Sequence, residues 1–424
     1  MQQTIDLPLS WYEHTVERES RAGLDAPVEA DVCVIGGGLA GLTTALELAR
    51  LGKSVVLLEA QHVAFGASGR NGGFVSNGFA LGIEDIAERV GFDEALALYN
   101  LSRLGTAYVR HLINTHEPSV IMGKGMRVCV RYQDKGELAR HGDFLRENFK
   151  ENVAAMTTDE TRLHLNTDRY FDSLYFPDAF HIHPLRYALL LAKLCRQSGV
   201  AIHELSAARR VEKTSAGFFV KTDQGVVRAG EIVHCVSALD RQLHQPSGRA
   251  VLPVATHIAV TAPIQQDVIR TPSAIADTRR AGNYFRLIDE GRILWGGRIT
   301  TQQVEPRQLA DVMLRDMKRC FPKLQKPAID FAWSGIMAYA LHKMPLIGRD
   351  NDGQWFATGF GGHGLNTTAM AGVLIARAIA QGDDTYKRFA AFPPRHAFGP
   401  LGWLGVQSTY WGMQMRDKLD ETFK

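Results

Sequence analysis

The sequence has few cysteines, and they follow no recognisable pattern. Only five occur among 424 residues, and no two of them are spaced as CxxC. We therefore expect neither a disulfide framework nor a zinc site, and the reducing cytoplasm is the expected location. The five residues are Cys33, Cys129, Cys195, Cys235 and Cys320.

Long apolar runs and a large net charge are absent as well. No stretch approaches the roughly 20 apolar residues of a membrane-spanning helix, and residues 1–20 lack the basic start and apolar run of a signal peptide. The formal net charge of +3 is too small for an electrostatic nucleic-acid site. With 45% hydrophobic and 22% charged residues, we expect a soluble folded protein without a nucleic-acid partner or membrane association.

The first strong pattern begins at Asp31. Residues 32–35 are a short β-branched run that is typical of a buried strand, and residues 39–51 place apolar side chains on one face of a helix. Residues 54–58 predict a second strand. This order of strand, helix and strand predicts a right-handed βαβ unit that starts a parallel sheet.

A glycine-rich turn joins the first strand to its helix. Gly36, Gly38 and Gly41 have the GxGxxG spacing, in which the backbone approaches a pyrophosphate at the helix N-terminus. Glu59 ends the next strand, where a carboxylate can accept hydrogen bonds from a ribose. Because all these features occur in register, we predict a dinucleotide site rather than a structural turn. Leu39, Ala40 and Ala60 belong to the same expected site.

Two further glycine-rich segments follow, at residues 65–73 and 359–368. The first suits a loop that wraps a diphosphate and reaches a flat ring. The second precedes a helix, whose free N–H groups and partial positive charge would stabilise a reduced isoalloxazine. These segments favour a flavin over a nicotinamide. Their candidate cofactor-binding residues are Ser68, Gly69, Arg70, Asn71, Gly72, Gly73, Gly361, Gly362, His363, Gly364 and Leu365.

With these motifs the sequence resembles the D-amino-acid-oxidase-like superfamily of FAD-dependent oxidoreductases. The resemblance covers about residues 10–415 and implies that FAD is the cofactor. Relatives that bind FAD covalently use a cysteine upstream of the last glycine motif, and residues 333–348 contain none, so we expect non-covalent FAD. The resemblance rests on the segments 31–38, 65–73, 181–185 and 360–364 and on the hairpin from Tyr284–Arg286 to Trp295–Gly297.

The fold class that we expect is α/β, with a Rossmann-like FAD-binding domain and an inserted α+β substrate domain that carries an antiparallel sheet. A chain of this length is too long for one ordinary domain. The expected division is residues 1–85, 176–250 and 330–395 for the FAD-binding domain, 86–175 and 251–329 for the substrate domain, and 396–424 for a C-terminal aromatic tail. The tail either packs on its own core or a partner subunit, or lies at a membrane interface.

The resemblance implies an amine or amino-acid oxidase or dehydrogenase. Such an enzyme oxidises the C–N bond of an amine to an imine by hydride transfer to flavin N5, and oxygen or an electron-transfer acceptor then takes the electrons. The catalytic candidates are His363, Arg286 and Tyr284. His363 either contacts the flavin or substrate or only caps its loop, and Arg286 and Arg298 either bind a substrate carboxylate or lie on a solvated strand face.

Two substrate classes remain open. Relatives that bind an α-amino acid have two lysines, at positions aligned here with Asn366 and Trp295, and their replacement favours gamma-glutamylputrescine or a related polyamine. The alternative is a secondary or cyclic amino acid such as L-pipecolate, proline or sarcosine, which needs a carboxylate clamp. Tyr339 and His342 are further candidates for the pocket lining. His181 and His183 lack a third ligand, so we expect no metal site.

Overall fold

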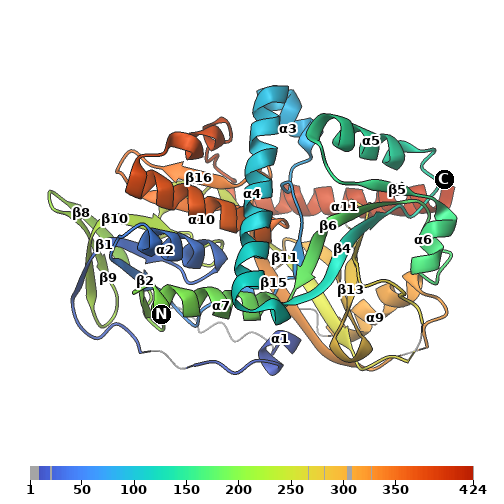
Figure 1. The fold of residues 1–424 in the computed structure, drawn as a ribbon, viewed down its shortest axis with the longest axis horizontal. Helices are drawn as coiled ribbons and strands as arrows, with labels where there is room; N and C mark the ends of the chain where they lie inside the picture. The colour runs from blue at the N-terminus through green and yellow to red at the C-terminus, as the bar shows by residue number, and fades with distance from the viewer. Residues whose placement is uncertain are drawn as a thin grey trace.

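The computed structural model describes residues 9–19, 22–265, 267–280, 282–302, 308–325 and 327–423. These residues build two sheets that lie side by side (Figure 1). The first sheet and α2 (Leu39–Arg50) lie on the left of that view, and the second sheet lies on the right. The mixed α/β fold with one mainly parallel and one mainly antiparallel sheet confirms the expected fold class.

The first sheet is parallel at its centre, where β1 pairs with both β2 and β10, and β10 pairs with β17. The expected βαβ unit is confirmed as β1, α2 and β2. Residues 226–234 form one continuous strand, β10. The strands of this sheet are β1 (Val28–Ile35), β2 (Val55–Leu58), β7 (Ala201–His203), β8 (Arg210–Thr214), β9 (Gly217–Lys221), β10 (Val226–His234), β16 (Leu346–Arg349) and β17 (Trp355–Thr358).

Both faces of the parallel strands are buried. In β1, Val32 and Val34 join the core under the helices, whereas Cys33 and Ile35 join a second cluster on the opposite face. This explains the continuous apolar run in the sequence, because a strand buried on both faces shows no alternation. The helices that pack together on the first core are α2, α4 (Phe92–His116), α7 (Pro184–Gln197) and α10 (Gly364–Gln381).

The second sheet is mainly antiparallel, with one parallel pair between β12 and β4. The predicted hairpin is confirmed as β13 and β14, and the second strand extends four residues beyond Gly296. The strands are β3 (Phe74–Val75), β4 (Ile121–Cys129), β5 (Ala154–Met156), β6 (Ser173–Ile182), β11 (Val251–Thr261), β12 (Ala274–Asp277), β13 (Tyr284–Ile288), β14 (Arg292–Thr300) and β15 (Ile329–Ala340).

Gly91 separates two helices. This glycine has φ of +86° and lies between α3 and α4, a backbone region that glycine enters without steric cost. The helix expected after the glycine-rich segment 359–368 is α10, and it begins inside that segment, at Gly364. The other helices are α1 (Trp11–His14), α3 (Ile83–Val90), α5 (Glu137–Phe149), α6 (Thr158–His164), α8 (Gln245–Gly248), α9 (Leu309–Cys320) and α11 (Gly399–Phe423).

We keep the division of the chain into two domains and a tail as a proposal. The boundaries proposed at residues 176 and 330 fall inside β6 and β15, which both belong to the second sheet. Residues 1–8 of the first segment lie outside the described part of the chain. The two strands would therefore connect the domains.

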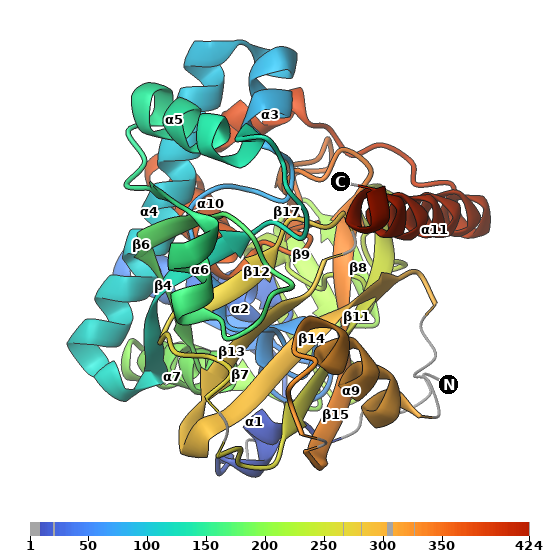
Figure 2. The same ribbon diagram turned by 90° about the vertical axis from the view of Figure 1, so that its right-hand side faces the viewer.

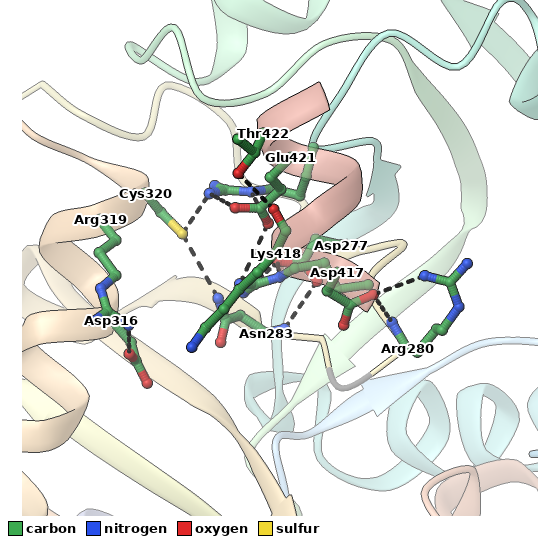
Figure 3. Close-up of polar contacts among 12 residues, drawn as sticks. Asp277, Arg280, Asn283, Asp316, Arg319, Cys320, Asp417, Lys418, Glu421 and Thr422 are labelled. Atoms are coloured by element: carbon green, nitrogen blue, oxygen red, sulfur yellow. Dashed lines mark hydrogen bonds and ion pairs between the residues drawn. The ribbon is translucent and has the colours of Figure 1, made fainter. Parts of the chain in front are cut away.

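The tail forms α11, which lies along one side of the molecule (Figure 2). It is held by polar side chains: Arg280 donates to Asp417 at 3.1 Å (Figure 3). Arg280 also donates to Asp420 at 3.1 Å. The side-chain oxygen Oε1 of Gln407 accepts a hydrogen bond from the backbone amide of Thr301 at 2.9 Å. Of the apolar side chains of α11, Tyr410 is buried. The following are exposed: Leu401, Leu404, Trp411, Met415, Leu419 and Phe423.

Candidate active site

A cavity of about 560 Å³ lies where the parallel strands of the first sheet end. Gly36 follows β1, Glu59 follows β2 and Cys235 follows β10, and all three line it. Ligands of open α/β sheets bind at this edge, outside the carboxyl ends of the strands. The three glycine-rich segments meet in this one cavity, which therefore holds most of the predicted cofactor-binding residues.

The first glycine turn is closely packed from behind. A Cβ on Gly41 would lie 1.9 Å from the carbonyl oxygen of Gly36, so only glycine fits. Gly41 does not line the cavity, whereas its neighbours at the start of α2 do. Ser68 Oγ accepts a hydrogen bond from the Leu39 amide at 3.0 Å, which joins the second segment to the helix N-terminus. The lining residues of this turn are Gly36, Gly38, Leu39 and Ala40.

Glu59 and Ala60 line the cavity beside this turn. The Glu59 carboxylate accepts hydrogen bonds from the amides of Gly37, at 2.7 Å, and Gln61, at 2.8 Å. Burial raises the pKa of Glu59, and the two amide donors oppose that shift. The carboxylate is thus fixed in one orientation at the end of β2.

The second glycine segment is folded by its own asparagine. Asn71 Nδ2 donates to the carbonyls of Ala67 and Ser68, at 3.0 Å each, and Asn71 Oδ1 accepts from the Gly73 amide at 2.8 Å. Trp333 Nε1 donates to the Arg70 carbonyl at 2.9 Å, which ties the loop to β15. Gly69 packs against Ala64 away from the cavity. The predicted cofactor-binding residues of this segment that line the cavity are Ser68, Arg70, Asn71, Gly72 and Gly73.

His363 precedes α10 at the opposite end of the cavity. Its Nε2 lies 3.0 Å from the carbonyl oxygen of Asn77 and 3.2 Å from that of Ser76. Carbonyls only accept, so Nε2 carries the proton and Nδ1 is left as the acceptor. Burial lowers the pKa of His363, which keeps the ring neutral. Gly361, Gly362, Gly364 and Leu365 line the same end.

Tyr284 and Tyr339 form the aromatic walls near His363. The Tyr284 ring packs against Gly72 and Gly296, where a Cβ would lie 2.7 Å and 2.0 Å from it. Burial raises the pKa of both phenols, so both stay neutral at physiological pH. This end of the cavity is therefore largely apolar around a neutral imidazole.

Arg286, expected to meet substrate, does not line the cavity. Its side chain is 0% exposed and donates to Tyr12 Oη at 3.0 Å and to the Ile182 carbonyl at 2.9 Å. Although Arg286 shares a strand face with Tyr284, the backbone of Gly73 lies between its guanidinium and the cavity.

Several other expected positions also face elsewhere. Arg298 is paired with Asp316, and His342 lies 3.3 Å from the Pro393 carbonyl. Asn366 donates to the Gly78 carbonyl at 3.1 Å, and Trp295 stacks on Phe285 in the core beside α9. Neither of these last two side chains lines the cavity, and the substrate preference inferred from the absence of lysine there stays a prediction.

Part of the lining could not be predicted from the sequence. Residues 335–338 of β15, Met126 of β4 and Thr256 of β11 reach the cavity only through the pairing of distant strands. The residues after β7 and β10 could have been found, because they follow parallel strands at their carboxyl ends. They are Ala207, Ala208, Val236, Ser237, Leu239 and Asp240.

A second cavity of about 180 Å³ adjoins the first and shares Ser76, Met126 and His363 with it. Its lining includes Glu84 and Glu151 but, among the described residues, no lysine or arginine. Glu151 is buried and paired with Arg103 at 3.0 Å.

His181 and His183 are engaged elsewhere. His181 Nε2 lies 2.8 Å from the Pro272 carbonyl, and His183 Nε2 lies 2.9 Å from Thr15 Oγ1. Within the described ranges, no group of three or more His, Cys, Asp or Glu side chains is arranged to hold a metal ion. None of the helices described there is long and apolar enough to cross a membrane.

Comparison with known proteins identifies the family. The sequence profile of the DAO family, described as FAD dependent oxidoreductase, matches residues 31–378. A probable oxidoreductase, OrdL of Haemophilus influenzae, is 32% identical over 386 residues, 87% of each chain. Gamma-glutamylputrescine oxidoreductase of Escherichia coli is 29% identical over 376 residues, 87% of this chain and 88% of that protein.

Solved structures show the same fold. Glycine oxidase from Geobacillus kaustophilus is 21% identical and superimposes with a TM-score of 0.73 over 88% of this chain and 100% of that one. L-proline dehydrogenase from P. horikoshii is 19% identical, with a TM-score of 0.70 over 87% of this chain and 100% of that one. The chain belongs to the DAO family of FAD-dependent oxidoreductases and is an enzyme with FAD as its cofactor.

The described residues fit this cofactor. The cavity has the size of a cofactor site. Its two ends carry different groups: a fixed carboxylate beside the N-terminus of α2, and the N-terminus of α10 at the other end. A carboxylate suits a ribose, and the amides of a helix N-terminus suit phosphate or a negatively charged ring.

Proposed function

We propose that the enzyme oxidises the C–N bond of an amine to an imine. The observation that carries this proposal is the single cavity in which the glycine-rich cofactor site continues to His363, Tyr284 and Tyr339. The proposal extends to the roles of the cavity-lining residues: the glycine segments and Glu59 hold FAD, and the aromatic end receives the substrate.

The reaction balances with water as the other reactant. A C–H bond of the carbon next to nitrogen and an N–H bond break, and a C=N double bond forms. The N–H proton passes to solvent, and the hydrogen of the C–H bond would leave with its electron pair to the cofactor. FAD supplies a two-electron acceptor when bound. Water then hydrolyses the imine to an aldehyde or keto product and releases the amine nitrogen. Oxygen or an electron-transfer partner is the proposed final acceptor.

The surroundings of His363 suit a neutral amine. The buried, largely apolar end disfavours an ammonium ion and so favours the unprotonated amine that the reaction requires. His363 Nδ1 is oriented by the hydrogen bonds of Nε2 to Ser76 and Asn77. It can accept a hydrogen bond from an amine N–H and so fix the position of the carbon that is oxidised.

The proposed substrate is gamma-glutamylputrescine or a related polyamine. A relative named for that substrate is 29% identical over most of the chain. The second cavity continues from His363 and is lined by Glu84 and Glu151. This arrangement favours an extended, cationic amine over a compact amino acid.

The alternative is a secondary or cyclic amino acid such as L-pipecolate, proline or sarcosine. Glycine oxidase and L-proline dehydrogenase share the fold, which favours this class. A carboxylate clamp would then be needed. Arg280 is the candidate, because it lines the cavity beside Tyr284, although it is paired with Asp417 and Asp420.

Product formation and KM distinguish the two classes. Gamma-glutamylputrescine, putrescine, proline, pipecolate and sarcosine would be compared by kcat/KM with the FAD-loaded enzyme. We expect the polyamines to be preferred by at least tenfold, and Arg280→Gln to leave putrescine turnover unchanged. A preference for an amino acid, with KM raised at least tenfold by Arg280→Gln but not by the control Arg298→Gln, would establish the alternative.

We propose that FAD is held without a covalent bond. Cys235 lines the cavity beside the first glycine turn, and burial raises the pKa of its thiol to about 12. The reactive thiolate is therefore disfavoured. All five cysteines are free and buried, which supports the cytoplasm as the proposed location.

A further inference from the structure

Arg286 carries a buried charge for which the described residues supply no counter-charge. Its side chain is 0% exposed, and its Nε has no hydrogen-bond partner. Nη2 donates to Tyr12 and to the Ile182 carbonyl. Nη1 contacts His181 Nδ1 at 2.7 Å and Met122 Sδ at 3.3 Å. Within the described part of the chain no carboxylate lies within 4.0 Å of it.

The neighbours of this guanidinium stay neutral. Burial and the charge of Arg286 lower the pKa of His181 to about 3. Burial, Arg186 and Arg286 likewise lower the pKa of His183 to about 3. Burial raises the pKa of the Tyr12 phenol. Because an arginine does not lose its proton in a protein, the cluster carries one positive charge at neutral pH.

An isolated buried charge is unfavourable unless an opposite charge compensates it. Among the described residues, no aspartate or glutamate lies beside Arg286 to compensate its charge. The compensating charge is therefore expected from a bound group.

The guanidinium lies directly behind the cavity wall. A Cβ on Gly73 would lie 2.6 Å from Nη2 of Arg286, and Gly73 itself lines the cavity. Tyr12 accepts from Nη2 and donates from its own Oη to the Asn71 carbonyl at 2.9 Å, and Asn71 also lines the cavity. One residue of backbone, Gly73, therefore separates the charge from the cavity.

The position along the loop indicates which part of FAD is involved. Ser68, five residues before Gly73, bonds the N-terminus of α2 at the phosphate end. Ser76, three residues after Gly73, lies beside His363 at the opposite end. Gly73 is thus on the His363 side of the loop, where the flavin ring is expected.

We propose that Arg286 is the buried counter-charge of the flavin ring and favours its reduced form. Reduction adds negative charge to the ring, whereas the charge of the diphosphate stays constant. Arg286 is in this role a positioning residue that acts through the field across Gly73, without touching substrate. The fully buried Tyr12 of α1 orients the guanidinium and connects it to the loop.

The test is the midpoint potential of the bound flavin, measured by spectroelectrochemistry. Arg286→Met should lower it by at least the equivalent of a tenfold change in the ratio of reduced to oxidised protein, about 30 mV for a two-electron couple. Arg286→Lys, which keeps the charge, should retain most of the potential.

A second pair of variants covers the case in which Arg286→Met does not fold. Met122 is only half-buried and contacts Nη1, so Met122→Glu places a carboxylate beside the guanidinium. Met122→Glu should lower the potential as Arg286→Met does, and the uncharged control Met122→Gln should not. Equal potentials in the two Met122 variants would overturn the proposal. The proposal would also be overturned if Arg286→Met left the potential unchanged and weakened the affinity for oxidised and reduced FAD equally. That result would show that the charge interacts with the diphosphate.

Discussion

The imidazole of His363 donates from Nε2 to the carbonyl oxygen of Asn77, 3.0 Å away. This bond fixes the tautomer of a ring that burial keeps neutral, and it leaves Nδ1 as an acceptor. The residue lines both cavities. A substrate that passes between them must therefore meet His363.

Replacement of His363 by glutamine tests its proposed contact with the amine. The glutamine amide can still donate to the Asn77 carbonyl, but it supplies no acceptor at the position of Nδ1. We expect kcat/KM to fall by about 10- to 100-fold, with FAD content unchanged. His342→Gln is the matched control, because His342 does not line the cavity. Equal kcat/KM in the His363 variant and the control would contradict the proposed role.

The Glu59 carboxylate is expected to set FAD affinity. In Glu59→Gln only one side-chain oxygen remains to accept from Gly37 and Gln61, and the negative charge beside the ribose is lost. We expect the Kd for FAD to rise by about tenfold, as for the loss of a charge-assisted hydrogen bond. Asp31→Asn is the control, since Asp31 lies in the neighbouring strand β1 and its carboxylate accepts from Ser54 instead. Fluorescence titration of the apoprotein gives both values, and an unchanged Kd for Glu59→Gln would refute the assignment.

Acid should destabilise the protein through its buried histidines. Burial, and less strongly Arg298, lowers the pKa of His257 from 6.5 to about 4. Between pH 6.5 and 4 the unfolded state therefore binds a proton that the folded state does not. As the pH is lowered through this window, the free energy of unfolding decreases by about 1 kcal/mol per pH unit for one such histidine.

The variant His257→Asn isolates this contribution. Its amide oxygen can replace Nδ1 as the partner of Ser334 Oγ, which lies 2.9 Å from Nδ1. Urea unfolding at pH 7.5 and 5.0 should show a smaller loss of stability for the variant than for the wild type. An equal loss would show that His257 does not titrate on unfolding.

The ion pairs of Arg280 are expected to hold α11 in place. Asp417→Asn combined with Asp420→Asn removes both partners of that guanidinium. Trypsin should then cleave faster after the exposed Arg416 and Lys418, because local opening of the helix becomes easier. Asp384→Asn, which removes the exposed pair with Lys387, should leave cleavage unchanged. Equal cleavage of all three proteins would contradict this role.

The sequence predicted the elements whose pattern is local. The turn from Gly36 to Gly41, the helix behind it and the hairpin at Tyr284 are determined by neighbouring residues, and each is confirmed. The pairing of β12 with β4 joins residues about 150 positions apart, and no local pattern encodes it. Met126, which reaches the cavity from β4, was missed for that reason.

The direction of single side chains was harder to predict. Tyr284 and Arg286 lie on the same face of β13, as strand alternation predicts. Only Tyr284 reaches the cavity, because Gly73 lies over Arg286. In α11 the apolar side chains suggested the buried face, whereas the helix is held by Gln407 and Asp417. In β13 and in α11 the direction of a side chain depends on the segments that pack against the strand or helix, and the sequence of the strand or helix itself does not predict them.

Anaerobic reduction of the bound flavin tests the central claim most directly. The purified FAD-loaded protein would be mixed without oxygen with gamma-glutamylputrescine, putrescine, pipecolate, proline and sarcosine in turn, while the flavin absorbance is followed. We predict that an amine bleaches the flavin, with a polyamine acting at the lowest concentration. A flavin that dithionite reduces fully but that none of these amines bleaches would contradict amine oxidation.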